Sequence, residues 1–445
     1  MTPDRVSSRT YFGQQATLDS LVVGSTPAPR APRREAGLAP PPYLLHRGDA
    51  LDAYGDWPVP AAIISDGAYG VRGFPGDTVG TEGLADWYLP HIEAWSRLSG
   101  PATTLWFWNT EVGWATVHPL LARHGWDYVQ TITWDKGVRH IAGNVNGRTI
   151  RRFPVVSEVC VFYQRRFEVS GPDGPMDVQR WMRHEWLRSG LALNRANEAC
   201  GVANAATRKY LTTDWLWYWP PGEMVERLAA YANAHGAKSG WPYYSLDGRA
   251  PVTAKGWDAL RFKWRHTHGL TNVWRLAPLH GVERLKGTMR RAAPRVYNPG
   301  SLSAAHLNQK PLELMRRILH AATDEGDVIW EPFGGLASGA VAAVQARRFP
   351  CVAERDHDFA EIAAQRLADA VADRDCRDDP GTQGADEGMP GINELCDKHH
   401  YDGRLAKYRM TRRLCSGFVI GIFIKRAGTC KCQPKVVTQP ARVAA

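Results

Sequence analysis

The fold is decided by the stretch Asp327-Val-Ile-Trp-Glu-Pro-Phe-Gly-Gly-Leu-Ala-Ser-Gly-Ala340, in which an apolar run leads directly into a turn of small residues. We expect a strand before the turn, a helix over 341–347, and a second strand over 349–353 that ends at Glu354. Small residues let the backbone approach a ligand, and an acid after the next strand accepts hydrogen bonds from ribose hydroxyls. The stretch therefore predicts a nucleotide-type binding turn.

The same alternation of strands and helices extends over most of the chain. Upstream of the turn, strands are expected over 61–65, 103–108, 128–134 and 158–163, and helices over 84–98 and 113–124. A further helix is expected over 312–322. Strands separated by helices predict an α/β fold, a largely parallel sheet with helices on both faces.

Composition divides the chain into five parts. Residues 1–40 are rich in Pro, Arg, Ala and Ser and predict a flexible basic segment. Residues 41–175 and 271–375 are expected to form two halves of one α/β domain. Residues 176–270, between them, predict a mainly helical insert rich in Arg and aromatic side chains. Residues 376–445 hold five of the eight Cys without familiar zinc spacing, which predicts a disordered tail and no metal site.

Charge and apolar content narrow the class of protein. Lys and Arg number 55 against 45 Asp and Glu, a formal net charge of +10 that favours a polyanionic partner. The first ten residues lack the apolar core of a secretion signal, and no apolar run is long enough to span a bilayer. The scattered Cys do not form a disulfide framework. We therefore expect a cytoplasmic protein without a membrane partner.

Two motifs resemble the cofactor half of a known family. Glu331-Pro-Phe-Gly-Gly335 is similar to the Asp-Pro-Phe-x-Gly motif of the amino-group DNA methyltransferases, which modify adenine N6 or cytosine N4. His306-Leu-Asn-Gln-Lys-Pro311 resembles the His-Pro-Thr-Gln-Lys-Pro element that precedes it. The resemblance covers about residues 41–370 and implies a Rossmann-like fold that binds S-adenosylmethionine. Departures are Glu331 for Asp, and Leu336-Ala337 for the family's Ser-Gly.

The resemblance also implies roles for individual residues of this half. Glu331, Phe333 and Gly335 would line the methionine end of S-adenosylmethionine, and Glu354 would hold its ribose. Asn308 and Lys310 would lie on the cofactor side of the preceding element.

The catalytic half resembles the family at Ile63-Ile-Ser-Asp66-Gly67-Ala68-Tyr69-Gly70, where Asp-Pro-Pro-Tyr usually follows a buried strand. An exocyclic amine is a poor nucleophile because its lone pair is delocalised into the ring. A carboxylate and a carbonyl that accept its two hydrogens localise that lone pair, and an aromatic side chain stacks on the flipped base. Asp66, the Gly67 carbonyl and Tyr69 are the candidates for these roles, although the two Pro are missing.

Two later segments and the motif order support this interpretation. Trp134-Asp-Lys136 resembles the family's Trp-x-Lys, and Ser157-Glu-Val-Cys-Val-Phe-Tyr163 resembles its Glu-x-Ile-Leu-Val-Phe strand. The catalytic motif precedes the insert and the cofactor motif follows it, which is the permuted order of the β group of these enzymes.

The insert contains a candidate DNA reader. Residues 186–211 predict a helix, a turn at Gly201 and a second helix from about Asn204, as in helix-turn-helix units. Asn204 and Arg208 are natural readers of adenine and guanine edges, and Lys209 is suited to phosphate. A purely structural helical hairpin is the alternative.

The leading hypothesis is a site-specific methyltransferase that acts on adenine N6 of double-stranded DNA, because Asp heads the catalytic motif. Cytosine N4 stays open, since Ser65 stands one residue before Asp66. A catalytically inactive DNA-binding protein that keeps the cofactor fold, and an RNA methyltransferase, are the further alternatives. The recognition sequence, the oligomeric state and a cognate restriction endonuclease cannot be inferred from the sequence.

Overall fold

The computed structural model describes residues 42–71, 77, 80–138, 140, 146, 148–171, 174–280, 283–287, 303–304, 306 and 308–378. The predictions of a flexible segment over 1–40 and of a disordered tail with Cys and His fall almost wholly outside these residues. Within the described ranges, no helix has the length and apolar character needed to cross a membrane.

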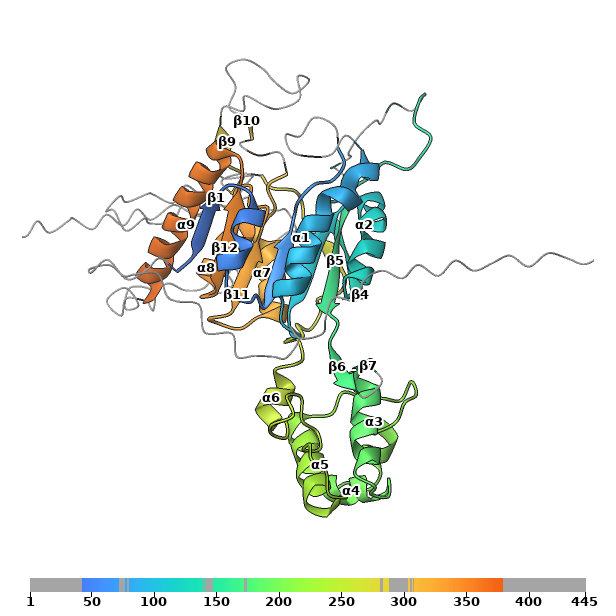
Figure 1. The fold of residues 1–445 in the computed structure, drawn as a ribbon. Helices are drawn as coiled ribbons and strands as arrows, with labels where there is room; N and C mark the ends of the chain where they lie inside the picture. Colours follow the sequence, from blue (N-terminus) through green and yellow to red (C-terminus); the bar gives the residue numbers. More distant parts are fainter. Residues whose placement is uncertain are drawn as a thin grey trace, which may run out of the picture. The chain divides into compact units, whose positions relative to one another are not determined.

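The centre of the fold is an eight-stranded sheet with the strand order β1-β12-β11-β2-β3-β5-β4-β8 (Figure 1). Its strands are β1 (Leu44–Arg47), β2 (Ala62–Ser65), β3 (Thr104–Asn109), β4 (Trp126–Asp135), β5 (Ser157–Arg165), β8 (Val273–Arg275), β11 (Val328–Glu331) and β12 (Phe349–Glu354). All neighbours run parallel except β5, which is antiparallel to both β3 and β4. The largely parallel α/β sheet expected from the sequence is confirmed.

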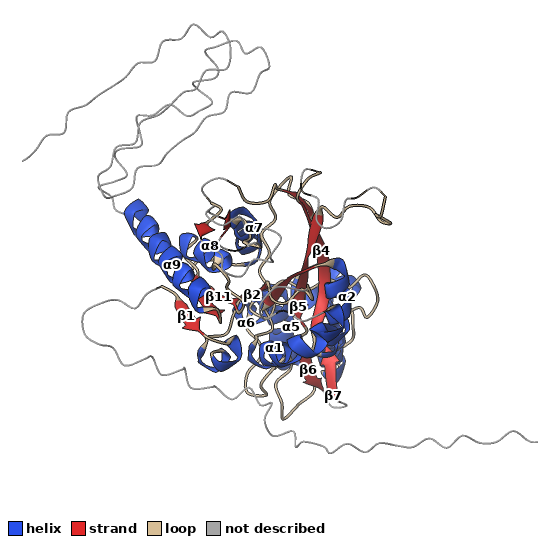
Figure 2. Ribbon diagram, turned by 90° about the horizontal axis from the view of Figure 1, so that it is seen from above, coloured by secondary structure: helices blue, strands red, loops and turns tan. Residues whose placement is uncertain are grey.

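Helices cover both faces of the sheet, as Figures 1 and 2 show. One face packs on α1 (Leu84–Leu98) and α2 (Glu111–Arg123), and the other on α7 (Leu312–Ala322), α8 (Ser338–Gln345) and α9 (His357–Asp378). In β2, Ile63 belongs to the core under α1, while Ala62 and Ile64 belong to the core under α7. Alternate residues of a strand point to opposite faces, so a strand covered on both sides is apolar throughout.

The helical insert has a hydrophobic core of its own. Residues 176–270 share this core with the hairpin that starts before them, β6 (Glu168–Gly171) and β7 (Gly174–Asp177). The hairpin is followed by α3 (Val178–Arg188), α4 (Arg195–Cys200), the π-helical turn η4 (Ala206–Tyr210), α5 (Gly222–His235) and α6 (Ala254–Asp258). Trp181, Trp186 and Trp257 are almost fully buried within this core. This core explains most of the insert's tryptophans by packing.

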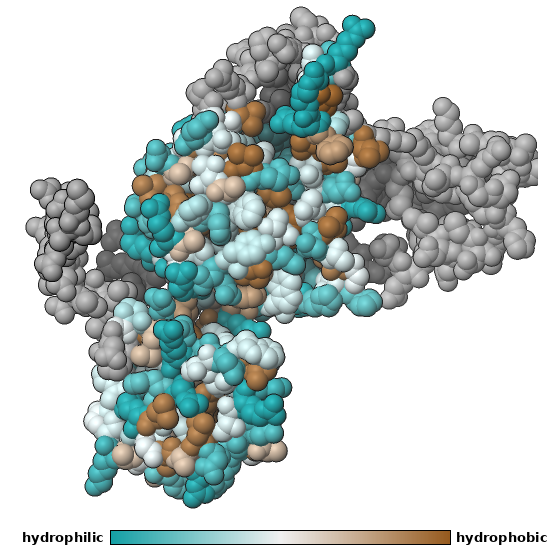
Figure 3. Space-filling model, turned by 90° about the vertical axis from the view of Figure 1, so that its right-hand side faces the viewer, coloured by the Kyte–Doolittle hydropathy of each residue, from teal (hydrophilic) through white to brown (hydrophobic). Residues whose placement is uncertain are grey.

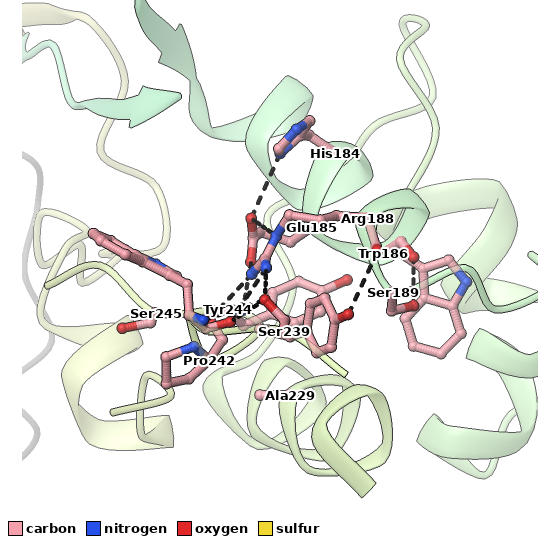
Figure 4. Close-up of polar contacts among 12 residues, drawn as sticks. His184, Glu185, Trp186, Arg188, Ser189, Ala229, Ser239, Pro242, Tyr244 and Ser245 are labelled. Atoms are coloured by element: carbon pink, nitrogen blue, oxygen red, sulfur yellow. Dashed lines mark hydrogen bonds and ion pairs between the residues drawn. The ribbon is translucent and has the colours of Figure 1, made fainter. Parts of the chain in front are cut away.

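A buried carboxylate links two parts of the insert by hydrogen bonds (Figure 4). Glu185, 5% exposed, accepts hydrogen bonds from Arg188 at 3.0 and 2.6 Å and from the backbone N–H of Tyr244 at 2.7 Å. Arg188 in turn donates to the carbonyls of Trp241 and Pro242. The end of α3 is thereby joined to the loop that follows α5.

Helix lengths in the insert differ from the prediction. The expected first helix is interrupted, because α3 ends at Arg188, Gly190 adopts a φ of 71°, and α4 starts only at Arg195. The second helix is only the short turn η4. The remaining short elements are three 3₁₀ turns (Ala50–Asp52, Tyr54–Asp56 and Thr81–Gly83) and the two-residue strands β9 (Lys286–Gly287) and β10 (Ser303–Ala304).

On the face in Figure 3, hydrophobic residues form small groups among hydrophilic ones, as is usual for a protein surface.

Candidate active site

Two loops leave the sheet at the same edge and touch. β11 pairs in parallel with β2, so the segments 332–335 and 66–70 follow neighbouring carboxyl ends. A Cβ added to Gly67 would lie 2.7 Å from the Phe333 ring and 2.7 Å from the Tyr88 hydroxyl. Only glycine therefore allows this approach between the catalytic motif and the cofactor motif.

Asp66 is the centre of a polar cluster. Its Oδ1 accepts hydrogen bonds from the Tyr69 hydroxyl at 2.7 Å and from Lys310 Nζ at 2.7 Å, and its Oδ2 accepts from the same Nζ at 2.9 Å. Lys310 Nζ also lies 3.1 Å from the Tyr69 oxygen. Lys310 stands just before α7, in the other half of the domain, so the structure joins the two halves at this carboxylate.

The protonation states of this cluster follow from its surroundings. Burial opposes the charge on Lys310, but the carboxylates of Asp66 and Glu158 raise its pKa above the ordinary value. Burial raises the pKa of the Tyr69 hydroxyl well above its ordinary value, and the same two carboxylates raise it further. Lys310 is therefore charged at neutral pH, while the Tyr69 hydroxyl is neutral and donates a hydrogen bond to Asp66.

A second carboxylate, 15% exposed, continues the network. Glu158, at the start of β5, lies 3.3 Å from Lys310 Nζ through Oε2 and forms an ion pair with Lys136 through Oε1. Burial would raise the pKa of Glu158, but Lys310 and Lys136 lower it below the ordinary value. The network therefore alternates between acidic and basic side chains, in the order Asp66, Lys310, Glu158 and Lys136. Sequence reasoning noted the motifs that contain Glu158 and Lys136 but did not assign either to the site.

Side chains from elsewhere hold the catalytic turn. The Ala68 carbonyl accepts hydrogen bonds from the Tyr88 hydroxyl at 3.0 Å and from Asn109 Nδ2 at 2.9 Å. The Asp77 carboxylate accepts from the backbone N–H groups of residues 69, 70 and 71 at 3.0, 2.7 and 3.1 Å. These contacts hold the backbone of residues 68–71 in place. Sequence reasoning missed all three side chains, because no local pattern identifies them.

Glu331 organises the glycine-rich turn. It is 4% exposed and accepts hydrogen bonds from the backbone N–H of Gly339 at 2.8 Å and of Ala340 at 2.6 Å, both in the first turn of α8. Burial raises its pKa to about 7, although these two hydrogen bonds oppose the shift. The turn itself needs left-handed backbone, with φ of 52° at Gly335 and 54° at Ala337. Glu331 therefore positions the turn by holding the start of α8.

Glu354 connects the turn to the end of β12. Its Oε2 accepts a hydrogen bond from the Gly335 N–H at 2.6 Å, and its Oε1 accepts from the Asp356 N–H at 2.7 Å. Burial raises the pKa of Glu354 above its ordinary value. A carboxylate has about four lone-pair sites, so each oxygen keeps capacity for a ligand hydroxyl.

An aromatic cluster surrounds Phe333. Its ring centroid lies 4.9 Å from that of His91, 5.1 Å from Trp87 and 6.2 Å from Trp95. Phe333 is half-buried, so one part of the ring stays available beside the turn. Asn308, which the resemblance also assigned to the cofactor side, is exposed.

The family of the chain follows from a comparison of its whole α/β part. A family model of DNA methylases, the N6/N4 methyltransferases, matches residues 38–365. The chain belongs to this family. It is therefore an amino-group DNA methyltransferase, with both motifs and the insert inside the matched range.

Three solved structures are among those to which the chain is similar. The M1.HpyAVI–SAM complex is 13% identical, covers 73% of this chain and 98% of its own, and has a TM-score of 0.38. TTHA0409 of Thermus thermophilus, named as a putative DNA modification methylase, is 15% identical, with coverages of 74% and 96% and a TM-score of 0.37. The cytosine-N4-specific PvuII DNA methyltransferase is 11% identical, with coverages of 74% and 93% and a TM-score of 0.38.

The sequence-predicted residues of the methyltransferase fall into separate groups. Asp66, Tyr69 and Lys310 contact one another, Gly67 packs on Phe333, and Gly335 binds Glu354. The resemblance predicted that Lys310 lies on the cofactor side. In the structure its ammonium group donates a hydrogen bond to the Asp66 carboxylate. The three candidate DNA readers, Asn204, Arg208 and Lys209, are exposed on or beside η4 of the insert.

Proposed function

We propose that this DNA methyltransferase transfers the methyl group of S-adenosylmethionine to adenine N6 of a flipped base within a specific duplex site. The observation that carries the proposal is the cluster of Asp66, Tyr69 and Lys310 at the edge of the sheet, in contact with the glycine-rich turn through Gly67. The acid at the head of the catalytic motif favours adenine.

The geometry of Asp66 suits a hydrogen-bond acceptor for the amine. Oδ1 already accepts from Tyr69 and Lys310, whereas Oδ2 accepts only from Lys310 among the described residues and keeps a lone pair. In our proposal Oδ2 and the Gly67 carbonyl accept the two amine hydrogens, which directs the nitrogen lone pair toward the methyl group. Lys310 keeps the carboxylate oriented, and Tyr69 stacks on the flipped base.

The glycine-rich turn fits S-adenosylmethionine. A Cβ on Gly334 would lie 2.6 Å from Val352, so glycine lets the turn pack closely on β12, and Gly335 has a φ of 52°, which favours glycine. The turn therefore carries no side chain at these two positions. In our proposal Glu354 accepts hydrogen bonds from the ribose hydroxyls, and Phe333 and Gly335 flank the methionine part. When bound, S-adenosylmethionine supplies a methyl group activated by a positively charged sulfur. Asn308 and Lys310 are proposed to lie on the cofactor side of the segment before α7, with the Lys310 ammonium directed to Asp66.

The insert is proposed to read the DNA. Asn204, Arg208 and Lys209 are exposed, and η4 presents them within a short segment that Asn197 holds by a hydrogen bond to the Thr207 N–H. Arg and Asn read guanine and adenine edges by paired hydrogen bonds, and Lys binds phosphate.

An inactive DNA-binding protein is the alternative suggested by the missing Pro pair. In favour of an active enzyme, Tyr88, Asn109 and Asp77 hold the turn of residues 66–71 by hydrogen bonds where the Pro pair is missing.

Transfer of a labelled methyl group to mixed-sequence duplex DNA tests the proposal. We expect incorporation as N6-methyladenine at one short sequence, which sequencing of the methylated DNA identifies. N4-methylcytosine in its place would contradict the choice of base. No incorporation by protein that binds the cofactor would favour the inactive alternative, and stronger competition by RNA than by duplex DNA would favour an RNA substrate.

A further inference from the structure

One aromatic side chain of the insert is exposed to an unusual degree. Trp215 is 89% exposed, whereas eight other tryptophans are at most 2% exposed. It lies between η4 and α5, and its neighbours Leu216 and Tyr218 are also exposed, at 39% and 51%. Single exposed apolar side chains are ordinary, but Trp215, Leu216 and Tyr218 are exposed together in one short segment, and grouped exposed apolar side chains are typical of interaction sites.

The backbone that carries Trp215 is held in place. From α3, Gln179 donates to the carbonyls of Thr212 and Asp214 at 3.3 and 2.9 Å, and Arg183 donates to the carbonyl of Leu211 at 2.9 Å. These bonds fix the segment just before Trp215.

The segment after Trp215 is bonded to η4. The Tyr218 N–H donates to the Lys209 carbonyl at 2.8 Å, and the Trp217 indole N–H donates to the Tyr210 carbonyl at 3.2 Å. The exposed indole therefore projects from a fixed base, directly beside the turn that carries Lys209.

Charge identifies the partner. Arg208 and Lys209 are exposed on η4, and the one acid of the adjoining segment, Asp214, uses its carboxylate to accept the Leu216 N–H at 2.9 Å. Basic side chains next to exposed aromatic rings are typical of nucleic-acid surfaces, where the cations bind phosphates and the rings stack on bases.

We propose that Trp215 is a wedge that inserts its indole at a base step of the duplex held by Arg208 and Lys209. This inference rests on the proposed function, since it assumes that the insert binds the DNA substrate. An inserted ring partly unstacks the step and replaces base stacking with indole stacking. The energy of this contact is apolar, so it adds affinity that does not depend on salt.

The chain offers a matched control. Trp241, in the same insert, is 54% exposed, but its indole lies against Gly248, where an added Cβ would be 2.6 Å from the ring. It is therefore a packed surface residue. Trp241→Ala removes the same side chain from the insert without touching the proposed wedge.

The wedge is tested by measuring how the full-length variants bind a fluorescent duplex that contains the sequence methylated by the wild-type protein. We expect Trp215→Ala to raise Kd by about tenfold or more, while Trp241→Ala stays within about twofold and Trp215→Phe recovers part of the loss. The slope of log Kd against log salt should match the wild type for Trp215→Ala and fall for Lys209→Ala. Circular dichroism confirms that each variant is folded.

Two outcomes separate the wedge from the proposed function. A Kd for Trp215→Ala equal to that of wild type, while Lys209→Ala weakens binding, overturns the wedge and leaves DNA reading by the insert in place. Failure of the wild-type protein to bind or methylate duplex DNA overturns the proposed function and the wedge with it. A fluorescent adenine analogue placed along the duplex should brighten at the wedged step with wild type and not with Trp215→Ala.

Discussion

Replacement of Lys310 by Met should destabilise the protein far more than the loss of an ordinary ion pair. The Lys310 side chain is 3% exposed, and its ammonium lies 2.7 and 2.9 Å from the Asp66 oxygens and 3.3 Å from Glu158. Met fills a similar volume but leaves two carboxylates without their shared cation. Removing one partner of a buried pair costs about 3–5 kcal/mol. We expect a loss of this size in the free energy of unfolding.

Lys263→Met is the matched control, because it removes a lysine that also pairs with two acids, Asp324 and Asp327, but is 48% exposed. Solvent screens such pairs, whose worth is about 0–1 kcal/mol. Urea unfolding followed by tryptophan fluorescence measures both variants. Equal losses for Lys310→Met and Lys263→Met would refute the reasoning, because burial of the pair would then make no difference.

The pH dependence of the same cluster has a definite sign. The pKa of Glu158 is lowered in the folded protein by Lys310 and Lys136, although burial opposes this. Its contribution to stability is therefore complete above the ordinary carboxyl pKa and is lost as pH falls through the lowered value. Lys310→Met removes one of the two cations and so raises the pKa of Glu158 in the folded state. In urea unfolding at a series of acidic pH values, the variant should therefore lose less stability on acidification than wild type, and equal losses would contradict the pairing.

Three further predictions concern the two motifs. Asp66→Ala should abolish methyl transfer and leave cofactor binding, measured by calorimetry, unchanged; transfer that survives would remove Asp66 from its role. Gly67→Ala should reduce both activity and cofactor affinity at least about tenfold, because its Cβ would meet the Phe333 ring at 2.7 Å. Gly55→Ala is the control and should be neutral, because a Cβ there would meet open space. A cofactor affinity of Gly67→Ala equal to that of wild type would contradict the contact. Burial raises the pKa of Glu331 from 4.5 to about 7, so the stability contributed by its neutral form is complete below the ordinary value and is lost as pH rises through the raised one. The melting temperature of wild type should then decline between about pH 5 and about pH 7 more than that of Glu331→Gln, and parallel profiles would argue against the shift.

Much of the fold could be predicted because its elements have strong local signals. The helices expected over 84–98 and 312–322 have those bounds in the structure, since their apolar residues recur with helical spacing. The four-residue strand β1 has no such signal and was not predicted. The interruption between α3 and α4 depends on the backbone of Gly190, which periodicity does not reveal.

The candidate site was predictable only where a motif carries its chemistry. Asp66 and Glu354 stand at the ends of buried strands, a position that indicates a ligand edge in any parallel sheet. The contact of Lys310 with Asp66 spans 244 residues of sequence, and the clamp of Asp77 on the catalytic turn follows from no local pattern. Both are products of tertiary packing, which brings together groups that the chain itself keeps apart.

The most direct test of the central claim is mass spectrometry of nucleosides from duplex DNA incubated with S-adenosylmethionine and the wild-type protein. We predict N6-methyladenine with wild type and no methylated nucleoside with Asp66→Ala. N4-methylcytosine alone would contradict the adenine assignment, and an absence of any methylated nucleoside, with cofactor binding intact, would contradict amino-group methylation by this chain.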